Sequence, residues 1–231
     1  MAAAGFWAFV GASSLILGAL IAMSGRLSGW ALALLIGFGS GALISAVAYD
    51  LIEEAVAVSA TGLSVAVGFI AGAIIYFAGD QLIQRMPGSG GLEVLLGAVL
   101  DGIPESVVLG LSLVGGAGPS VAVLVAIFIS NVPESVASST DMLKGGRRPR
   151  WVLGVWTLVA LASALAAGLG YGLFAGASGD VIAFIDAFAA GAILTLLASE
   201  LLPSAHAERN PFVGLATAAG FAVAAMLTLN A

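Results

Sequence analysis

The residues most able to do chemistry stand in two short motifs inside apolar runs. Residues 101–107 read DGIPESV and residues 130–136 read SNVPESV, so the tetrapeptide PESV occurs twice. Asp101 and Glu105 are four positions apart, which places both carboxylates on one face of a helix. An ionisable side chain at mid-bilayer costs about 2.5–3.5 kcal/mol. Since no Lys or Arg lies at matching depth, these groups must hold protons or surround a cation, and a divalent ion would offset their desolvation and mutual repulsion together.

The second motif supplies the other half of a cluster of oxygen ligands. Ser130 and Glu134 repeat the four-residue spacing, and Asn131 lies beside Ser130. Pro104 and Pro133 have no N–H for the carbonyl four residues back, so each kinks its helix and frees a backbone oxygen that can help build an ion site. We predict that the two helices pack face to face. The predicted ligands are Asp101, Glu105, Ser130, Asn131 and Glu134.

The elements that hold these motifs are predicted to be membrane helices. Of the 231 residues, 61% are hydrophobic and 9% are charged, and the mean hydropathy is +1.14. A soluble domain carries about a quarter charged residues. Glycines are spread through the apolar runs, where small residues let membrane helices approach closely. No cysteine is present, which excludes disulfides and thiolate metal sites. We expect one all-α integral membrane domain over residues 1–231, without a cleaved signal peptide.

Eight spans of about the length of a bilayer core can be assigned. They cover residues 5–24, 30–54, 62–84, 92–114, 119–143, 151–175, 181–204 and 211–230. When these spans alternate across the membrane, all 7 basic residues fall in connections on one side. By the positive-inside rule that side is cytoplasmic. The prediction is a multi-pass protein of the cell membrane with both termini outside the cytoplasm.

Two further carboxylates lie nearer to the ends of predicted spans. Asp50 is toward the outer end of the second span, and Glu200 is toward the inner end of the seventh. We interpret Asp50 as a binding site at the entrance for the cation and Glu200 as one at the exit. The alternative for each is that it is an ordinary interfacial acid. His206 is the only histidine. A single histidine just past a helix end is more often a surface residue, and the alternative is a ligand at the cytoplasmic exit.

Other acids near the span ends are expected to be ordinary interfacial or surface residues. Asp80, Asp141 and Asp186 belong to this group. Glu53 and Glu54 are expected to be solvated at the outer surface, where their field attracts cations.

The chain also contains a longer internal similarity. Residues 37–55 and 187–205 align without gaps, and Asp50 lies opposite Glu200. The two segments belong to the second and seventh spans, which cross in opposite directions in the predicted topology. Inverted repeats of this kind place binding sites at their interface in transporters. We predict that spans 1–3 and 6–8 form such a repeat around spans 4 and 5; the alternative is that Gly/Ala-rich helices resemble one another by composition.

These features resemble the ZIP (Zrt-, Irt-like protein) family of metal ion transporters. ZIP span 4 typically reads H-N-x-P-E-G, and LDGIPESVVLG stands in its place here. SNVPES at 130–135 is similar to the x-x-x-P-E element of span 5, and Ser130 and Asn131 occupy the two positions before V-P-E. GAILTLLASELLPSAH at 191–206 resembles span 7 of bacterial members. The resemblance implies eight spans and a binuclear metal centre between spans 4 and 5.

The resemblance also assigns roles to single residues. Asp101 takes the position of the family's span-4 histidine, Glu105 and Glu134 correspond to its bridging glutamates, and Glu200 to its span-7 carboxylate. Gly102 stands at the position of the family's asparagine and offers no side-chain ligand to a second metal. The family's long histidine-rich cytoplasmic loop is absent. An all-oxygen site suits Mn²⁺ or Fe²⁺ better than a site with imidazole does.

The predicted function is transport of divalent metal cations toward the cytoplasm, with zinc first on the family resemblance and manganese, iron or cadmium as alternatives. The metal is the transported substrate, and no prosthetic cofactor is expected. The expected partners are metal ions and the lipid bilayer; no nucleic acid is expected, and glycine-rich helix faces are compatible with a homodimer.

Two other functions are compatible with intramembrane acids. One is an intramembrane metal-dependent lipid phosphatase, which would need basic residues at its site to hold phosphate. The other is a proton channel or a proton-coupled carrier. We expect a transporter and not an enzyme, because every Lys and Arg lies in a connection between spans.

Overall fold

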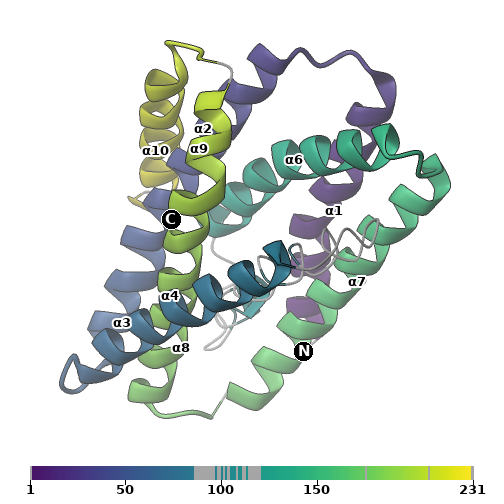
Figure 1. Ribbon diagram of the computed structural model, residues 1–231. Helices are drawn as coiled ribbons and strands as arrows, with labels where there is room; N and C mark the ends of the chain where they lie inside the picture. The colour runs from purple at the N-terminus through teal and green to yellow at the C-terminus, as the bar shows by residue number, and fades with distance from the viewer. Residues whose placement is uncertain are drawn as a thin grey trace.

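The computed structural model describes residues 2–85, 97, 100, 102, 105–107, 109, 110, 113, 121–174, 176–207 and 209–229. Over this part of the chain all regular secondary structure is helical and no strand occurs (Figure 1). The prediction of an all-α protein is confirmed. In chain order the segments are α1 (Ala2–Ser24), α2 (Gly29–Ser45), η1 (Ala46–Ile52), α3 (Glu53–Val58), α4 (Leu63–Gln84), α6 (Val121–Lys144), α7 (Pro149–Phe174), α8 (Gly179–Leu196), η2 (Leu197–Leu201), α9 (Leu202–Ala207) and α10 (Val213–Leu229).

Among the described residues, six helices are long and apolar enough to cross a membrane. They are α1, the continuous rod α2–η1–α3, α4, α6, α7 and the continuous rod α8–η2–α9. Their bounds agree with six of the predicted spans to within a few residues. The shorter apolar helix α10 coincides with the predicted span 211–230. The predicted span 92–114 lies largely outside the described residues, so the count of eight stays a prediction.

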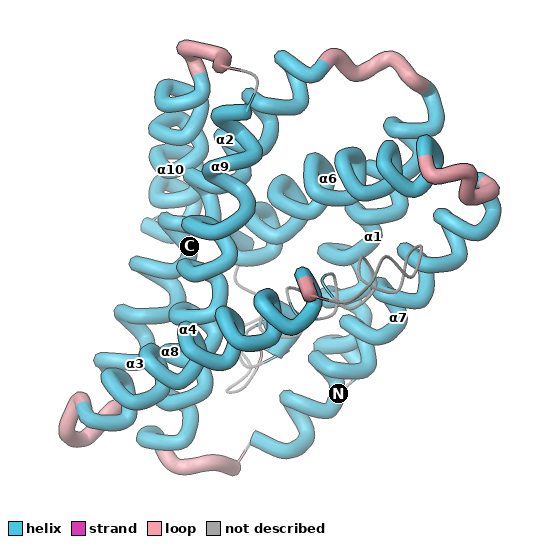
Figure 2. The backbone as a smooth tube through the Cα atoms, in the orientation of Figure 1, coloured by secondary structure: helices cyan, strands magenta, loops and turns pink. Residues whose placement is uncertain are grey.

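The turns gather at two opposite ends of the bundle (Figure 2). Those after α1, α6 and α9 lie at one end, and those after α3 and α7 lie at the other. Hydrogen bonds tie the turns together at each end. Asp180 Oδ1 accepts from the Ala60 N–H at 3.0 Å and from the Ser64 hydroxyl at 3.1 Å, and Asn210 Nδ2 donates to the Trp30 carbonyl at 3.3 Å. Successive rods therefore alternate in direction, as the assignment of spans requires.

The two longest rods contain a wide helical turn at the same place. η1 lies between α2 and α3, and η2 lies between α8 and α9, and both are π-helical. In each, the N–H of the following residue donates to a carbonyl five positions back. Asp50 and Glu200 occupy equivalent positions in these turns. π-Helical turns are rare and occur often at functional sites, so the same local backbone presents both acids.

Close backbone contact joins α2 to α10. Gly41 lies against the carbonyl oxygen of Thr217, and Gly220 lies against that of Phe38. A Cβ atom added at either glycine would overlap the facing oxygen. These two helices can approach as they do only because both contact positions lack a side chain.

The pair α4 and α8 repeats this contact. Gly191 lies against the carbonyl oxygen of Phe69, and Gly72 lies against that of Phe188. Gly191 and Phe188 are the residues that align with Gly41 and Phe38 in the internal similarity. The two aligned segments thus share their packing as well as their wide turn.

A second packing unit is built around α1, which contacts both α6 and α7. Gly18 of α1 lies against Ser135 of α6, where an added Cβ would overlap the serine hydroxyl. Trp156 of α7 is fully buried and donates from Nε1 to the Ser139 hydroxyl of α6 at 2.8 Å. This unit holds α6, which carries the second PESV motif.

The close contact between α2 and α10 predicts a specific loss of stability. We expect Gly41→Ala to destabilise the protein by about 1–3 kcal/mol, because the added methyl group forces two backbones apart. The matched control is Gly154→Ala on α7, where no atom lies within 4 Å of the added Cβ. Thermal unfolding of the purified protein in detergent should show a lower melting temperature for Gly41→Ala only. Equal melting temperatures for the two variants would contradict the contact.

Candidate metal-binding site

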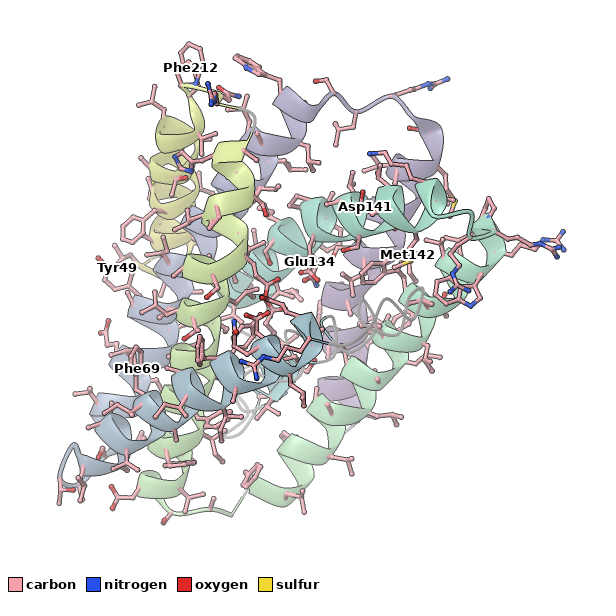
Figure 3. The ribbon with its side chains drawn as sticks, in the orientation of Figure 1. Tyr49, Phe69, Glu134, Asp141, Met142 and Phe212 are labelled. Carbon is pink, nitrogen blue, oxygen red and sulfur yellow. The ribbon has the colours of Figure 1, made fainter. Side chains whose placement is uncertain are left out.

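A cavity lies between α1, α6, α7 and the residues around Glu105. The space between its lining residues, part of it open to the outside, is about 350 Å³. Glu105 and Asn131 on its wall are 5% and 6% exposed, and the half-buried Glu134 lines it as well. Figure 3 shows Glu134 inside the bundle and Asp141 nearer to the end of α6. Two carboxylates and an amide therefore converge on one space.

The geometry of α6 accounts for this convergence. Asn131 and Glu134 are three positions apart, so both side chains project from the same face of the helix. Pro133 lies between them inside α6 and is fully buried. Because proline has no N–H, the carbonyl of Ile129 loses its helical donor. The helix thus offers two side chains and a freed backbone oxygen within one turn.

The structure brings three of the five predicted central ligands to this cavity. Ser130 faces elsewhere: its Cα packs against Gly39 of α2, and its hydroxyl donates to the Ile127 carbonyl at 3.1 Å. Asp101 lies outside the described residues. Within the described residues, no three His, Asp or Glu side chains come together as a metal cage. A cation held by Glu105, Glu134 and Asn131 would therefore need further ligands from water or from the rest of the chain.

Carboxylates continue from the cavity toward η2. Glu134 interacts electrostatically with both Glu105 and Glu200. Glu200 accepts a hydrogen bond from the Tyr76 hydroxyl at 2.9 Å, and it also interacts with Asp80 of α4. These acids lie near enough for their charges to interact, from the cavity to the junction of α4 with the α8–η2–α9 rod.

Asp80 was expected to be an ordinary interfacial acid, and that expectation is wrong. It is 7% exposed, and the Gln84 side-chain amide donates to its two carboxylate oxygens at 2.8 and 2.9 Å. Hydropathy indicates depth along a helix but not which face is covered. Asp80 is buried on a helix that packs closely against α8 through Gly72.

A second cavity also borders Glu105 and is apolar. Glu105 is the one acid among its described lining residues; the others are Leu43, Ala46, Val47, Leu51, Val123, Ile127 and Ile193. These side chains come from α2, η1, α6 and α8. Glu105 thus borders both cavities, and only the first also contains Asn131 and Glu134 among its described lining residues.

Asp50 and Glu200, the predicted entrance and exit sites, occupy matching places in the fold. Asp50 in η1 is half-buried and accepts a hydrogen bond from Thr228 of α10 at 3.1 Å, as Glu200 in η2 accepts one from Tyr76 of α4. His206 lies exposed on α9, and its Nδ1–H donates to the Leu202 carbonyl at 2.9 Å.

Comparison with known proteins gives one curated relative. No family model matches the sequence. The chain is similar to a protein of Arabidopsis thaliana described as a "putative zinc transporter", with 28% identity over 208 residues that cover 84% of this chain. The alignment covers 33% of the plant protein, so the chain spans about a third of the length of this relative.

Proposed function

We propose that this protein transports divalent metal cations across a membrane and that the cation binds between Glu105 and Glu134. The observation that carries the proposal is the convergence of the buried Glu105 carboxylate, the half-buried Glu134 carboxylate and the Asn131 amide on one cavity. Buried charges of one sign are stable only when an opposite charge or a proton accompanies them. A divalent cation supplies that charge, and carboxylate and amide oxygens are suitable ligands for it.

The distribution of basic residues supports transport over an intramembrane enzyme. Each of the seven Lys and Arg residues lies in a connection or within two residues of a helix end. A lipid phosphatase would need such groups at its site to hold the phosphate. The similarity to the plant protein described as a zinc transporter supports the same conclusion. It does not support a proton channel or a proton-coupled carrier of another substrate.

The ligands proposed for the metal are Glu105, Glu134 and Asn131 of the set predicted from the sequence. The proposed metal is zinc first, with Mn²⁺, Fe²⁺ or Cd²⁺ as alternatives. Asp101 is proposed as a further ligand, which would complete a cation site that two carboxylates leave open. Gly102 stands where the ZIP family has an asparagine, and an added Cβ there would lie 3.4 Å from Ser163 Oγ. Glycine therefore supplies no amide ligand. In a binuclear centre, water would have to take the place of this ligand at the second metal.

The arrangement of the two rods supports an inverted repeat. η1 and η2 interrupt them at equivalent positions, and the same glycine contacts join each rod to its neighbour. We propose that spans 1–3 and 6–8 form this repeat around spans 4 and 5, in one membrane domain with both termini outside the cytoplasm. Glycine-rich faces would also allow a homodimer.

The two cavities suggest how passage is controlled. On the side of η2, the acids run from Glu105 through Glu134 and Glu200 to Asp80. On the side of η1, apolar side chains line the second cavity beside Glu105. Apolar side chains that line a narrow passage exclude a hydrated ion. We therefore propose that passage toward or from Asp50 requires this apolar side to open.

Metal flux into liposomes tests the proposed function. Purified protein, reconstituted with a fluorescent metal indicator inside, should take up Zn²⁺, Mn²⁺ or Cd²⁺. Glu105→Ala and Glu134→Ala should each abolish uptake, because the remaining carboxylate leaves the cation with too few ligands.

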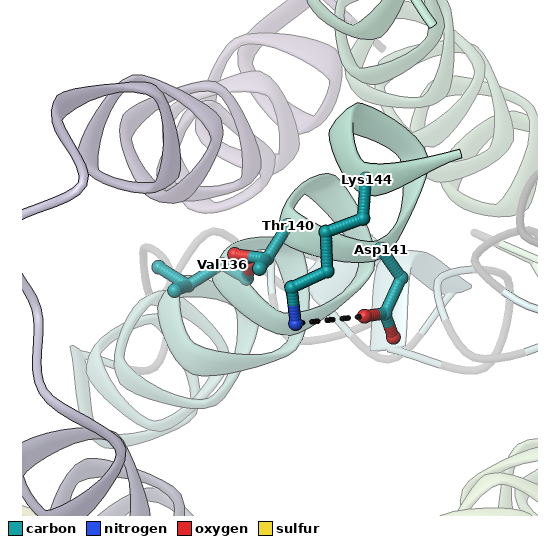
Figure 4. A network of polar contacts seen from close by, with 4 residues as sticks. All are labelled: Val136, Thr140, Asp141 and Lys144. Carbon is teal, nitrogen blue, oxygen red and sulfur yellow. Dashed lines mark hydrogen bonds and ion pairs between the residues drawn. The ribbon is translucent and has the colours of Figure 1, made fainter. Parts of the chain in front are cut away.

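The control for this experiment is Asp141→Asn. Asp141 is 79% exposed at the end of α6, with its carboxylate 3.9 Å from Lys144 Nζ (Figure 4). An exposed ion pair contributes little to stability, so uptake should be retained. Lipid hydrolysis without metal flux, or flux that survives both glutamate substitutions, would reject the proposal.

Metal binding should also appear as a change in stability. Without metal, and at a pH where these glutamates are ionised, Glu134→Gln should melt at a higher temperature than the parent, because the repulsion of Glu134 by Glu105 and Glu200 is removed. Zinc at about 100 times its Kd should stabilise the parent by about 2.7 kcal/mol, and the variant by much less. Thermal unfolding with and without zinc measures both effects. An equal zinc-dependent shift in parent and variant would show that Glu134 is not a ligand.

A further inference from the structure

Ser163 of α7 is a buried residue on the wall of the cavity that also contains Glu105 and Glu134. It is 8% exposed. The Thr157 hydroxyl of the same helix donates to the Leu153 carbonyl at 2.8 Å, whereas the Ser163 hydroxyl makes no hydrogen bond to any other residue that the structure describes. A buried polar group without a partner is unfavourable, so a water or an ion is needed beside this hydroxyl.

Two other buried polar atoms lack a hydrogen-bond partner in the described part of the chain, Ser45 Oγ and Asp186 Oδ2. Asp186 was expected from the sequence to be an interfacial acid, and that expectation is wrong, because this residue is 3% exposed. Neither Ser45 nor Asp186 is among the described lining residues of the two cavities. Of these three polar groups, Ser163 is the one that lines a described cavity.

The packing of α7 against the segment around Glu105 fixes the place of Ser163. A Cβ added at Gly110 would lie 2.6 Å from the Ala167 carbonyl oxygen, so the two backbones are in close contact there. Ser163 lies one helical turn before Ala167, and its Oγ would lie 3.4 Å from a Cβ added at Gly102. Gly102, Ser106 and Gly110 are four positions apart and share one face of a helical segment. Ser163 therefore lies against the face that carries Ser106.

Ser106 adds a second hydroxyl to the wall of this cavity. It is 5% exposed, and its Oγ donates to the Gly102 carbonyl at 2.5 Å. Because this bond uses the hydrogen of the hydroxyl, the oxygen keeps lone pairs that can bind a cation or a water. A serine or threonine hydroxyl is a direct ligand of Mg²⁺ in phosphate-binding loops. Both serines can therefore act as oxygen ligands.

We propose that Ser163 and Ser106 are further ligands of the transported cation and select for metals that prefer oxygen. The inference rests on the proposed transport function and extends its ligand set to α7. The residues of α1 that line the cavity, Ala8, Ala12 and Leu15, offer no side-chain ligand. The ion would then bind two carboxylates, one amide and two hydroxyls. Oxygen ligands favour hard cations such as Mn²⁺, whereas a soft cation such as Cd²⁺ prefers sulfur.

Initial rates of uptake into liposomes, measured over a range of free Mn²⁺ and of free Cd²⁺, test the role of Ser163. We expect Ser163→Ala to raise the apparent KM for Mn²⁺ by about tenfold, and Ser106→Ala to raise it as well. Ser163→Cys should increase the ratio of the Cd²⁺ rate to the Mn²⁺ rate by about tenfold, because a thiolate replaces a hydroxyl ligand.

The matched controls are Ser14→Ala and Ser14→Cys. Ser14 of α1 is fully buried, its hydroxyl donates to the Gly11 carbonyl of its own helix, and it is not among the described lining residues of the cavity. Both variants should keep the parent KM and the parent ratio of rates. A general effect of losing a buried hydroxyl or gaining a thiol would appear in these controls too.

Direct binding can be read from the absorbance of the purified protein. The chain has no cysteine, so Ser163→Cys introduces its only thiol. A thiolate bound to Cd²⁺ gives a charge-transfer band in the ultraviolet that oxygen ligands do not give. We expect this band in Ser163→Cys and not in Ser14→Cys. At the same Cd²⁺ concentration it should be lost in the double variant with Glu105→Ala, because the same ion needs both groups.

The inference is overturned if Ser163→Cys shows no band and keeps the parent ratio of rates, or if the band persists without Glu105. It is also overturned if Ser163→Ala lowers the melting temperature but leaves KM unchanged, because the hydroxyl would then be structural only. Should Ser163→Ala fail to fold, the Ser163→Cys variant decides the question. Failure of the proposed function is distinguishable, because the parent protein would then show no uptake of either metal.

Discussion

A carboxylate inside a membrane helix bundle is stable only if its charge is neutralised, and this constraint governs the structure. Glu105 and Glu134 share an interior cavity, and Glu200 and Asp80 continue the series. The basic residues that could pair with them lie at helix ends or in connections. Negative charge is thus concentrated where solvation is poorest and repulsion is least screened. Each of these carboxyl groups therefore needs a proton or a cation beside it, and the transport function proposed above supplies the cation.

The fold positions these acids by fixing helices at short distances, with glycine at the contacts. Glycines join α2 to α10 and α4 to α8, where side chains would not fit. In a membrane, packing of this kind replaces the hydrophobic effect as the source of helix association. Rigid pairs of rods can hold the acids of η1 and η2 in place while α6, packed with α1 and α7, presents Glu134 between them. The wide turns add two places where the backbone itself departs from regular helix.

Glu105 borders two cavities that differ in their lining. The first also contains Asn131 and Glu134, whereas Glu105 is the one acid among the described lining residues of the second. In the proposed transport, a cation would exchange one oxygen ligand for another in the first cavity and would lose water without replacement in the second. Which side chains line each cavity depends on how the helices lie against each other.

The sequence alone determined the helical class, the bounds of the helices that coincide with seven of the eight assigned spans over the described residues, and Glu105, Asn131 and Glu134 as polar residues that meet in the interior. It could do so because hydropathy and helical spacing are local properties, and because a charged residue in an apolar run is unusual by itself. Only the tertiary structure decided that Ser130 turns toward Gly39, that Asp80 joins the acids around Glu200, and that Asp186 is buried beside Glu54. Burial and partners depend on which helix faces are covered, and helix faces are covered by segments far away in the chain.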